Sequence, residues 1–423
     1  MTAATADDLV KRAENAERAG RRDEAFASWS ELVASYPDHP RALFLRGRRR
    51  MDEGQAADAL ALLTKSEAGD GALRETPFYA AVCHRHLRNP DAALDAVERA
   101  LALDPYYFMA LLSKGAILED LGKHRLAART YRDAIKIAPP EQSVPADARG
   151  ALQHAREQVA GNARALAEHL RRATATQRAG HPAARLERFD EGLDILAGVK
   201  SRQPQEPTML YYPRLPAIPF YDREHFEWLP RLESATATIQ RELEVALQDG
   251  RSALQPYIQY PPGAPVNQWA KLNHSPAWSS YFLWRDGEKQ EVNCARCPQT
   301  SALLDSLPLA QMPGYAPTVM FSVLSPHTHI PPHTGSANTR LIVHLPLVLP
   351  PDCVFRVGND TRSWEVGSAW VFDDSIEHEA WNDSSETRVI LIFDVWNPLL
   401  SEAERALVTE MLSALRAYNA AEY

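Results

Sequence analysis

The spacing of small and apolar residues divides the chain into a helical first part and a strand-rich second part. In the first third, small residues recur every 34 residues in phase, as in the series Ala25, Ala59, Ala93 and Ala127 and the series Ala13, Gly47, Ala81 and Gly115. Small side chains at fixed places let paired helices approach closely, so this period predicts stacked helical hairpins. A plain helical bundle is the alternative interpretation.

Helical spacing continues from residue 140 to about residue 204. The segment ARGALQHAREQVAGNARALAEHLRRA is rich in Ala, Arg, Glu and Gln and carries an apolar stripe, which predicts one or two linking helices. From Gln203 the chain becomes rich in Pro and Tyr (PQEPTMLYYPRLPAIPFYD), which marks a domain boundary. The pattern therefore predicts helical repeats over residues 6–139, a helical linker over 140–204 and a second domain over 205–423.

Short apolar runs dominate the second domain after Pro313. They are PTVMFSVL, RLIVHLPLVL, CVFRV, SAWVFD and RVILIFDVW, separated by turn clusters such as VGNDTRS. Such runs are typical of an all-β barrel or sandwich. One helix is expected over residues 229–248 and another from Ser401, where Ser401 and Glu404 form a capping box and Leu407, Met411 and Leu415 share one face.

The 34-residue period resembles the tetratricopeptide repeat (TPR) over residues 6–139. This resemblance implies an α-solenoid whose concave face takes peptide segments or partner helices. A recruiting or dimerising role is therefore the expectation for the first part of the chain, and the sequence leaves the oligomeric state open.

Composition and charge exclude several classes of function. A net charge of −9 over 423 residues provides no electrostatic footprint for nucleic acid or for an anionic membrane. No apolar run approaches the roughly 18 residues needed to span a bilayer, and the first residues lack the apolar core of a secretory signal. Four cysteines are too few for a disulfide framework, so we expect a reduced, cytoplasmic protein.

Histidines gather in the stretch HTHIPPHTGSANTRLIVH, and one more returns later. His333 in PPHTG and His378 in FDDSIEHEAW are 45 residues apart, each at the edge of a predicted strand. In a barrel this separation can bring both rings to one mouth, where imidazole suits iron, zinc, copper or nickel. Arg388 follows on the strand RVILIF and could clamp a carboxylate through two hydrogen bonds. The combination is expected of an Fe(II) enzyme that uses 2-oxoglutarate.

The blocks FSVLSPHTHIPPHTGSANTRLIVHLPL and SWEVGSAWVFDDSIEHEAWNDSSETRVILIFDVWNP resemble the aspartyl/asparaginyl β-hydroxylase family over roughly residues 205–400. The resemblance implies a double-stranded β-helix (a jelly roll, cupin-like) that uses Fe(II), 2-oxoglutarate and O₂. It also implies His333 and His378 as the only protein ligands of the metal. Gly335 stands where most 2-oxoglutarate oxygenases carry a ligating carboxylate, and this family is similar in lacking that carboxylate. We expect water in the vacant position.

The same resemblance assigns the residues around the metal. It implies that Arg388 and Ser322 hold the far carboxylate of 2-oxoglutarate, and that His344 reaches its metal-side carboxylate. Arg340 matches a family position near the substrate acid. Peptide-hydroxylating members carry a second arginine two residues later, where this chain has Ile342. That departure weakens the expectation of an aspartate substrate.

Other polar residues near the histidines have simpler interpretations. Asn338, Asp373 and Asp374 are candidates for orienting the second ring nitrogen of the ligating histidines. Asp373 and Asp374 could form an acid/base pair, but successive strand residues face opposite ways, so at most one of them points into the site. His327 and His329 are expected to be structural, and so are the tryptophans Trp364, Trp370, Trp381 and Trp396.

Cys294 and Cys297 form a CxxC motif that could indicate zinc. Zinc needs two more ligands, and the chain contains no second CxxC. The motif HIPPH cannot supply them from a helix, because its prolines forbid one. We therefore interpret NCARCPQT as a loop that packs on the barrel.

Three functions remain open from the sequence. The first is a dioxygenase that hydroxylates Cβ of an aspartyl or asparaginyl residue and releases succinate and CO₂; a free amino acid or a lipid acyl chain is the alternative substrate. The second is a halogenase, because a His-x-Gly…His pattern leaves room for chloride. The third is a non-catalytic scaffold. The repeats favour a peptide or protein substrate, and both histidines with Arg388 and Ser322 favour the dioxygenase.

Overall fold

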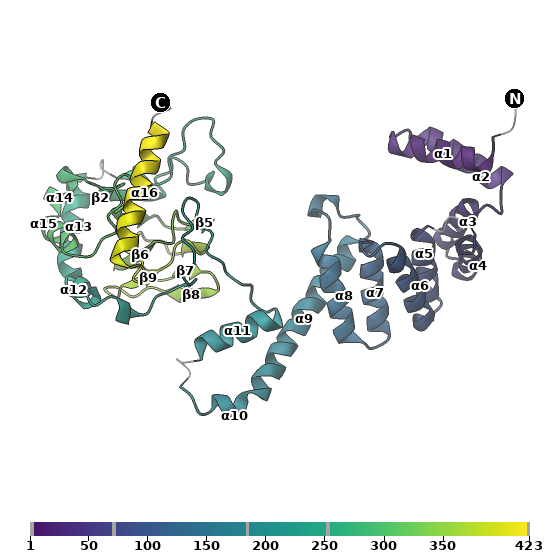
Figure 1. Ribbon diagram of the computed structural model, residues 1–423, viewed down its shortest axis with the longest axis horizontal. Coiled ribbons are helices and arrows are strands. Elements are labelled where there is room, and N and C mark those ends of the chain that lie inside the picture. Colours follow the sequence, from purple (N-terminus) through teal and green to yellow (C-terminus); the bar gives the residue numbers. More distant parts are fainter. Residues whose placement is uncertain (1–3, 70–72, 183–185, 251–253, 421–423) are drawn as a thin grey trace. The chain divides into compact units, whose positions relative to one another are not determined.

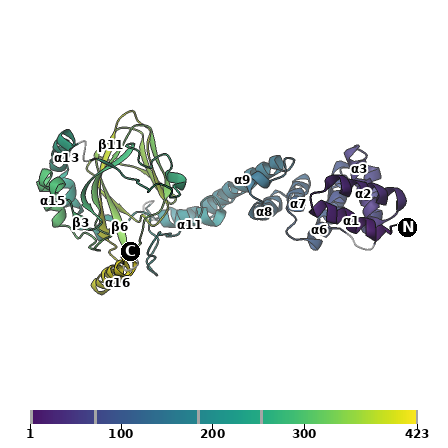
Figure 2. The same cartoon turned by 90° about the horizontal axis from the view of Figure 1, so that it is seen from above.

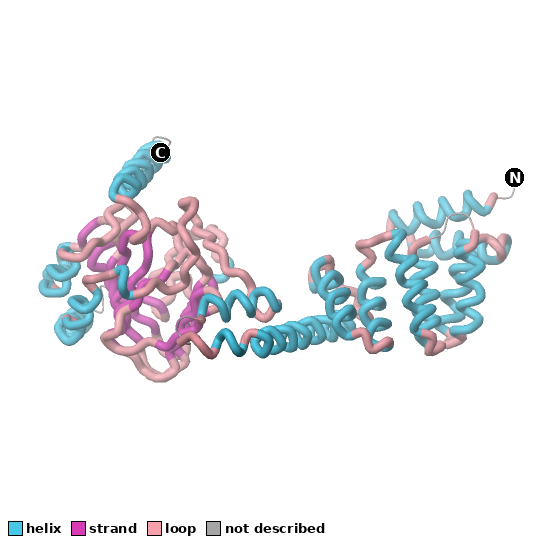
Figure 3. The backbone as a smooth tube through the Cα atoms, turned by 60° about the horizontal axis from the view of Figure 1, so that its bottom comes forward, coloured by secondary structure: helices cyan, strands magenta, loops and turns pink. Residues whose placement is uncertain are grey.

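The chain forms two compact units, Met1–Lys200 and Ser201–Tyr423. The computed structural model describes residues 4–69, 73–182, 186–250 and 254–420 (Figure 1). The first unit is helical and the second is built around β-sheets, as Figure 3 shows by colour. The predicted order of helical repeats followed by a strand-rich domain is confirmed.

Four antiparallel helix pairs make up the repeats of the first unit. They are α1 (Ala6–Arg18) with α2 (Arg22–Ser35), α3 (Pro40–Asp52) with α4 (Ala56–Glu67), α5 (Glu75–His86) with α6 (Pro90–Leu103), and α7 (Phe108–Asp120) with α8 (His124–Lys136). The alanines of the 34-residue series are buried, which explains their small size. Gly115 shows the same constraint, because a Cβ added there would overlap the ring of Tyr131 on the next helix.

In the described part of residues 140–200, three α-helices follow the repeats, where the sequence predicted one or two. They are α9 (Arg149–Ala173), α10 (Ala175–Arg178) and α11 (Glu187–Ala197), preceded by the short helix η1 (Glu141–Ser143). Helix α9 packs on α8, and α11 packs back on α9. Residues up to Lys200 therefore belong to the first compact unit.

Two antiparallel sheets form the second unit and face each other across its interior (Figure 2). The larger sheet has the order β1 (Gln255–Pro256), β2 (Trp278–Arg285), β4 (Val319–Leu324), β11 (Arg388–Trp396), β6 (Arg340–Val348), β9 (Trp370–Phe372), and β3 (Glu288–Lys289) pairs with β2. The smaller sheet has the order β5 (Thr328–His333), β10 (His378–Asn382), β7 (Cys353–Val357), β8 (Asp360–Ser363). Strand β2 was not predicted; its aromatic run WSSYFLWR extends the larger sheet.

Helices cover the outer face of the larger sheet. They are α12 (Leu229–Ser234), α13 (Thr236–Gly250), α14 (Glu291–Arg296) and α15 (Pro298–Asp305). The single helix predicted over residues 229–248 breaks at Ala235 into two. The CxxC segment is also helical, which corrects the predicted loop, and the thiols of Cys294 and Cys297 are buried against backbone carbonyls.

The long strands of the larger sheet are buried on both faces. On β6, Leu341, Val343 and Leu345 pack in the core beneath the helices. The alternate residues Arg340 and His344 face the interior of the unit, because successive strand residues point to opposite sides. The same alternation on β4 and β11 turns one set of side chains to the helices and the other set inward. It decides which residues can form a site.

The last helix, α16 (Glu402–Ala420), begins with the predicted capping box. The Ser401 N–H donates to Glu404 at 2.8 Å, and the Glu404 N–H donates to the Ser401 hydroxyl at 3.3 Å. Its buried residues are Val408 and Leu412, whereas the predicted apolar face of Leu407, Met411 and Leu415 is exposed. Within the described ranges, no helix is both long and apolar enough to cross a bilayer.

Glu242 on α13 caps the start of α15 and provides a stability test. Its buried carboxylate accepts from the Gln299 and Thr300 N–H groups at 2.8 Å and from the Thr300 hydroxyl at 2.6 Å. We expect Glu242→Ala to lower the free energy of unfolding of the second unit by about 1–3 kcal/mol, because buried donors lose their acceptor. Denaturant unfolding followed by tryptophan fluorescence measures this, since only Trp29 lies in the first unit. Glu244→Ala, exposed on the same helix, is the control, and equal losses in both variants would contradict the capping role.

Candidate metal and anion site

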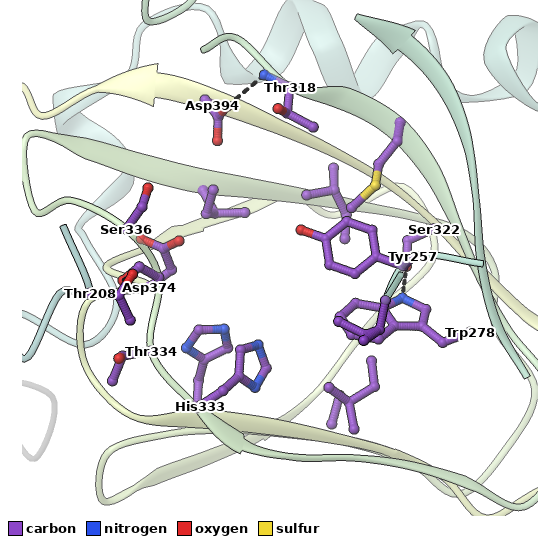
Figure 4. A pocket seen from close by; sticks show the side chains of 18 of the residues that line it. Thr208, Tyr257, Trp278, Thr318, Ser322, His333, Thr334, Ser336, Asp374 and Asp394 are labelled. Atoms are coloured by element: carbon purple, nitrogen blue, oxygen red, sulfur yellow. Dashed lines mark hydrogen bonds between the residues drawn. The ribbon is translucent and has the colours of Figure 1, made fainter. Parts of the chain in front are cut away.

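The two predicted histidines meet at one point of the smaller sheet. His333 ends β5 and His378 begins β10, and the two residues are direct register partners. Their ring centroids lie 4.1 Å apart. Both rings line a cavity of about 750 Å³ between the sheets. In Figure 4 the side chains of His333 and Asp374 point into this cavity, and Tyr257 and Trp278 lie across it from Asp374.

Backbone carbonyls orient both rings. Nδ1 of His333 lies 2.8 Å from the Pro331 carbonyl oxygen, and Nδ1 of His378 lies 3.0 Å from that of Ile376. A carbonyl only accepts, so each Nδ1 carries the proton and each Nε2 keeps a free lone pair. Burial lowers the pKa of His333 to about 3 and that of His378 to about 4. Both rings are therefore neutral at pH 7 and able to bind a metal.

The residues predicted to orient these rings do other work. Asn338 holds the segment before the barrel instead, accepting from the Tyr212 N–H at 2.7 Å and donating to the Tyr212 carbonyl at 2.9 Å. Asp373 accepts hydrogen bonds from Ser375 and Gln205, and burial raises its pKa to about 6. The prediction that these side chains orient the rings was wrong. Each ring donates instead to the backbone carbonyl two residues before it, so no side chain is needed.

Gly335 makes room for a carboxylate from another strand end. A Cβ at this position would overlap the Asp374 carboxylate, and the Gly335 N–H donates to the Asp374 carbonyl at 2.6 Å. Of the adjacent aspartates, Asp374 lines the cavity and Asp373 does not. In the part of the chain that the structure describes, no group of three His, Cys, Asp or Glu side chains forms a metal cluster. The histidine pair thus has no third protein ligand there.

Arg388 is a buried cation without a counter-ion. Its side chain is 1% exposed, and no carboxylate of the described residues forms an ion pair with it. Its guanidinium donates to the Ser322 hydroxyl at 3.4 Å and lies 5.0 Å from the centre of the Trp364 ring, and its Nε has no partner among these residues. Burial lowers the pKa of Arg388 to about 10. Such a group fits an anionic ligand, because an unpaired buried charge is costly.

His344 adds a second unpaired group near Arg388. Its ring is buried between Phe355 and Phe372, with centroids 5.1 and 4.8 Å away. Nδ1 of His344 has no hydrogen-bond partner in the described chain, and burial lowers its pKa well below the usual value. Ser322 is already held by the Trp278 indole N–H at 3.1 Å. Arg388, Ser322 and His344 therefore form a ready site for a small acid.

Arg340 sits at the other end of the cavity between two carboxylates. It contacts Asp394 at 2.6 Å and Asp374 at 3.2 Å, and it donates to the Ser336 hydroxyl at 3.0 Å. Burial lowers the pKa of Arg340, but the two carboxylates raise it overall. Asp394, which also accepts from the Thr318 N–H at 2.6 Å, was not predicted from the sequence. Only the inward position of Asp394 on β11 indicates a role in the site. That position can be recognised only when the pairing of the strands is known.

Aromatic residues outside the predicted set close the cavity. Tyr257 and Trp278 stack with centroids 4.3 Å apart, and Trp269 lies 5.0 Å from the His333 ring. These residues precede β4 and carry no motif, so only the fold brings them to the site. Ile342 also lines the cavity, directly opposite Asp394 in the strand register.

The remaining predicted residues lie outside the cavity. His329 stacks on Trp381 at 5.0 Å and contacts Glu379 at 2.9 Å. Trp364 and Trp370 stack on each other and on Phe355. These contacts are structural, as predicted, except that Trp364 also covers Arg388.

Comparison with known proteins shows that this chain is similar to hydroxylases. A family model described as aspartyl/asparaginyl beta-hydroxylase matches residues 233–398, and a tetratricopeptide repeat model matches residues 9–39. The chain is 27% identical to the mouse aspartyl/asparaginyl beta-hydroxylase over 416 residues, which cover 93% of this chain and 55% of the relative. The chain thus spans about half the length of that relative.

Two further relatives match shorter parts of this chain. The human aspartyl/asparaginyl beta-hydroxylase is 42% identical over 130 residues, covering 30% of this chain and 17% of the relative. The ornithine lipid ester-linked acyl 2-hydroxylase of Rhizobium tropici is 35% identical over 202 residues, covering 47% of this chain and 67% of the relative. Relatives with different named substrates therefore share this domain.

The packing of Gly335 against Asp374 predicts a rescue. Gly335→Ala should lower the melting temperature and weaken metal binding, because its methyl group overlaps the Asp374 carboxylate. Asp374→Ala in the same chain should restore much of the lost stability by removing that overlap. Melting curves of both single variants and the double variant measure the coupling. Additive losses would show that the overlap is not the cause.

The unpaired charge of Arg388 predicts opposite effects on folding and binding. Arg388→Met should raise the free energy of unfolding of the ligand-free protein by about 1–4 kcal/mol, because an apolar side chain replaces an uncompensated buried charge. If the site binds a dicarboxylate such as 2-oxoglutarate, the unaltered chain should gain about 2.7 kcal/mol of stability at a hundredfold excess over its Kd, and the variant should lose that gain. Arg285→Ala, an exposed arginine on β2, is the control. A destabilised Arg388→Met variant that still binds 2-oxoglutarate would argue against an anion site.

Proposed function

The chain belongs to the aspartyl/asparaginyl β-hydroxylase family, and from this we propose that it is an Fe(II)- and 2-oxoglutarate-dependent dioxygenase that hydroxylates Cβ of an aspartyl or asparaginyl residue in a peptide or protein. The relatives named above are hydroxylases, which supports the reaction type. The observation that supports 2-oxoglutarate as cosubstrate is the environment of Arg388. This buried cation has no carboxylate partner among the described residues, and it lies in the same cavity as the histidine pair.

The strand order supports a double-stranded β-helix as the frame of this site. Four strands of the larger sheet run β4-β11-β6-β9, and the smaller sheet runs β5-β10-β7-β8. From β4 to β11, consecutive strands of the chain mostly alternate between the two sheets, as they do in a jelly roll. In such a frame the ends of β5 and β10 meet at one mouth, where the histidines lie.

The histidine pair supports a metal role. Nε2 of His333 and Nε2 of His378 are the free donors, and both rings are held by backbone carbonyls rather than by mobile side chains. Fe(II), when bound, would couple the oxidative decarboxylation of 2-oxoglutarate by O₂ to hydroxylation, with succinate and CO₂ as co-products. Neutral nitrogen ligands in an otherwise open first shell leave positions for cosubstrate and O₂.

The acid-binding residues would position the cosubstrate. Arg388 and Ser322 would hold the far carboxylate of 2-oxoglutarate through charge-assisted hydrogen bonds, and the unpaired Nδ1 of His344 would reach the other end. The Trp278 indole fixes the Ser322 hydroxyl. Tyr257, Trp269 and Trp278 would exclude water around the reacting carbon, which strengthens the polar contacts inside.

Asp374 argues against the halogenase alternative. A halide would occupy the space that Gly335 leaves beside the metal, and the Asp374 carboxylate already fills the space beyond the Gly335 backbone. A second anion there would meet like-charge repulsion. The unpaired charge of Arg388 likewise argues against a non-catalytic scaffold, because a domain without a ligand gains nothing from that charge.

One relative supports a second candidate substrate. The Rhizobium tropici protein is named for an ornithine lipid acyl chain, and this chain is 35% identical to it over 202 residues. Ile342 and Ile392 give the cavity an apolar wall that an acyl chain could contact. The repeats favour the peptide substrate, since TPR units typically mediate protein interactions and a small molecule needs no such surface. In this proposal the first unit recruits the protein substrate or a partner.

A coupled assay tests the proposed function. The protein is incubated with Fe(II), 2-oxoglutarate and a panel of peptides, and succinate is measured together with product heavier by one oxygen atom. We expect His333→Ala and His378→Ala to abolish both, because each variant removes one of two metal ligands, while circular dichroism stays unchanged. His329→Ala, on the same strand but 43% exposed, should keep its activity. Unaltered turnover in either cavity variant would refute the metal assignment.

A further inference from the structure

The substrate half of the cavity carries excess negative charge. Arg340 lies between the carboxylates of Asp374 and Asp394, at 3.2 and 2.6 Å, and all three side chains are at most 13% exposed. With both carboxylates ionised, one positive and two negative charges leave a net charge of −1. Oδ1 of Asp374 is buried and accepts no hydrogen bond from the described residues. Arg340 is therefore already neutralised.

No other arginine or lysine of the described residues lines this half of the cavity. Among the described residues that line the cavity, the arginines are Arg340 and Arg388. Arg388 and Asp394 stand six residues apart on β11, which separates them by roughly 20 Å along the strand. Glu206, Asp286 and Glu377 also line the cavity, but all three are exposed, Glu377 pairs with Arg356 at 2.8 Å, and Asp286 pairs with Arg285 at 3.7 Å.

A charged side chain at position 342 would change the net charge of the cluster formed by Asp374, Arg340 and Asp394. Ile342 lies between Arg340 and His344 on the inward face of β6 and is 8% exposed. In the register of the sheet it stands directly opposite Asp394. Cross-strand partners point to the same face and lie close enough to interact. An apolar side chain here leaves the charge of the Asp374–Arg340–Asp394 cluster at −1.

The charge of a substrate side chain then decides its fit. Fe(II) and 2-oxoglutarate carry +2 and −2 and together add no net charge when both are bound. A substrate carboxylate would then be the third around one guanidinium, in a site where water is scarce, so repulsion opposes it. An amide carries no charge. Its carbonyl can accept from Arg340, and its N–H₂ can donate to the Asp374 carboxylate, which lines the cavity. The amide satisfies both groups, whereas the carboxylate satisfies one and is repelled by the other.

From this balance we propose that the site selects an uncharged residue, an asparaginyl rather than an aspartyl side chain, for hydroxylation. The inference rests on the proposed function and narrows its substrate class. It makes Ile342 a specificity-determining residue and assigns Arg340 to the amide carbonyl instead of a substrate acid.

Matched peptides test this selection. Each pair in a panel is identical except for one Asn or Asp, and kcat/KM is measured for both with Fe(II) and 2-oxoglutarate saturating. We expect the unaltered protein to favour the Asn peptide by at least about tenfold, since like-charge contacts in buried sites cost this much or more. Ile342→Arg brings the cluster to neutrality and should shift the ratio toward Asp by at least about tenfold. Ile342→Met, which changes shape without charge, should keep the ratio of the unaltered protein.

A second variant protects the test against misfolding. Asp394→Asn removes one negative charge with little change in shape and should shift the ratio in the same direction as Ile342→Arg. Preference for the Asp peptide in the unaltered protein, or an unchanged ratio in both charge variants, would overturn the inference and leave the dioxygenase proposal standing. Hydroxylation of neither peptide by a protein that binds 2-oxoglutarate would overturn the peptide substrate and this inference together. Failure to bind 2-oxoglutarate would instead refute the proposed function itself.

Discussion

Strand alternation is the constraint on which the second unit depends. The strands β4, β6 and β11 each bury one face beneath helices and turn the other toward the cavity. Because successive side chains point to opposite sides, every second residue of these strands is free to be polar. Ser322, Arg340, His344, Arg388 and Asp394 all occupy such inward positions. A shift of one residue in any of these strands would turn its polar side chains toward the helices and its apolar side chains into the cavity. The same strand register therefore specifies both the fold and the site.

The cavity keeps two kinds of charge at its two ends. At one end Arg388 has no carboxylate partner among the described residues, and its pKa falls because burial disfavours the charged form. At the other end Arg340 has two carboxylates, and its pKa rises. A core built for stability alone would pair these charges or remove them. The unpaired Arg388 at one end and the paired Arg340 at the other fit a binding site that takes a small acid beside Arg388 and an uncharged group beside Arg340.

The first unit solves a different packing problem. Its helices have no sheet to cover, so they bury one another, and small residues at a fixed period allow the contacts. Each unit has its own core. The repeats can therefore serve recruitment without altering the register of the strands, and the chemistry can be interpreted from the second unit by itself.

The sequence by itself determined the helical repeats, the strand-rich domain and the residues most characteristic of the site, because these depend on local period and on motifs a few residues long. The histidine and arginine motifs predict His333, His378 and Arg388, the resemblance to the hydroxylase family adds Ser322 and His344, and all five line one cavity. Only the tertiary structure decided what completes it. The carbonyls of Pro331 and Ile376 replace the predicted orienting side chains, and Asp374 fills the space at Gly335. Asp394, Tyr257 and Trp269 reach the site through strand pairing and loop packing between residues far apart in the chain. Such contacts leave no local pattern in a single sequence, since the partner that gives each residue its role is chosen by the fold.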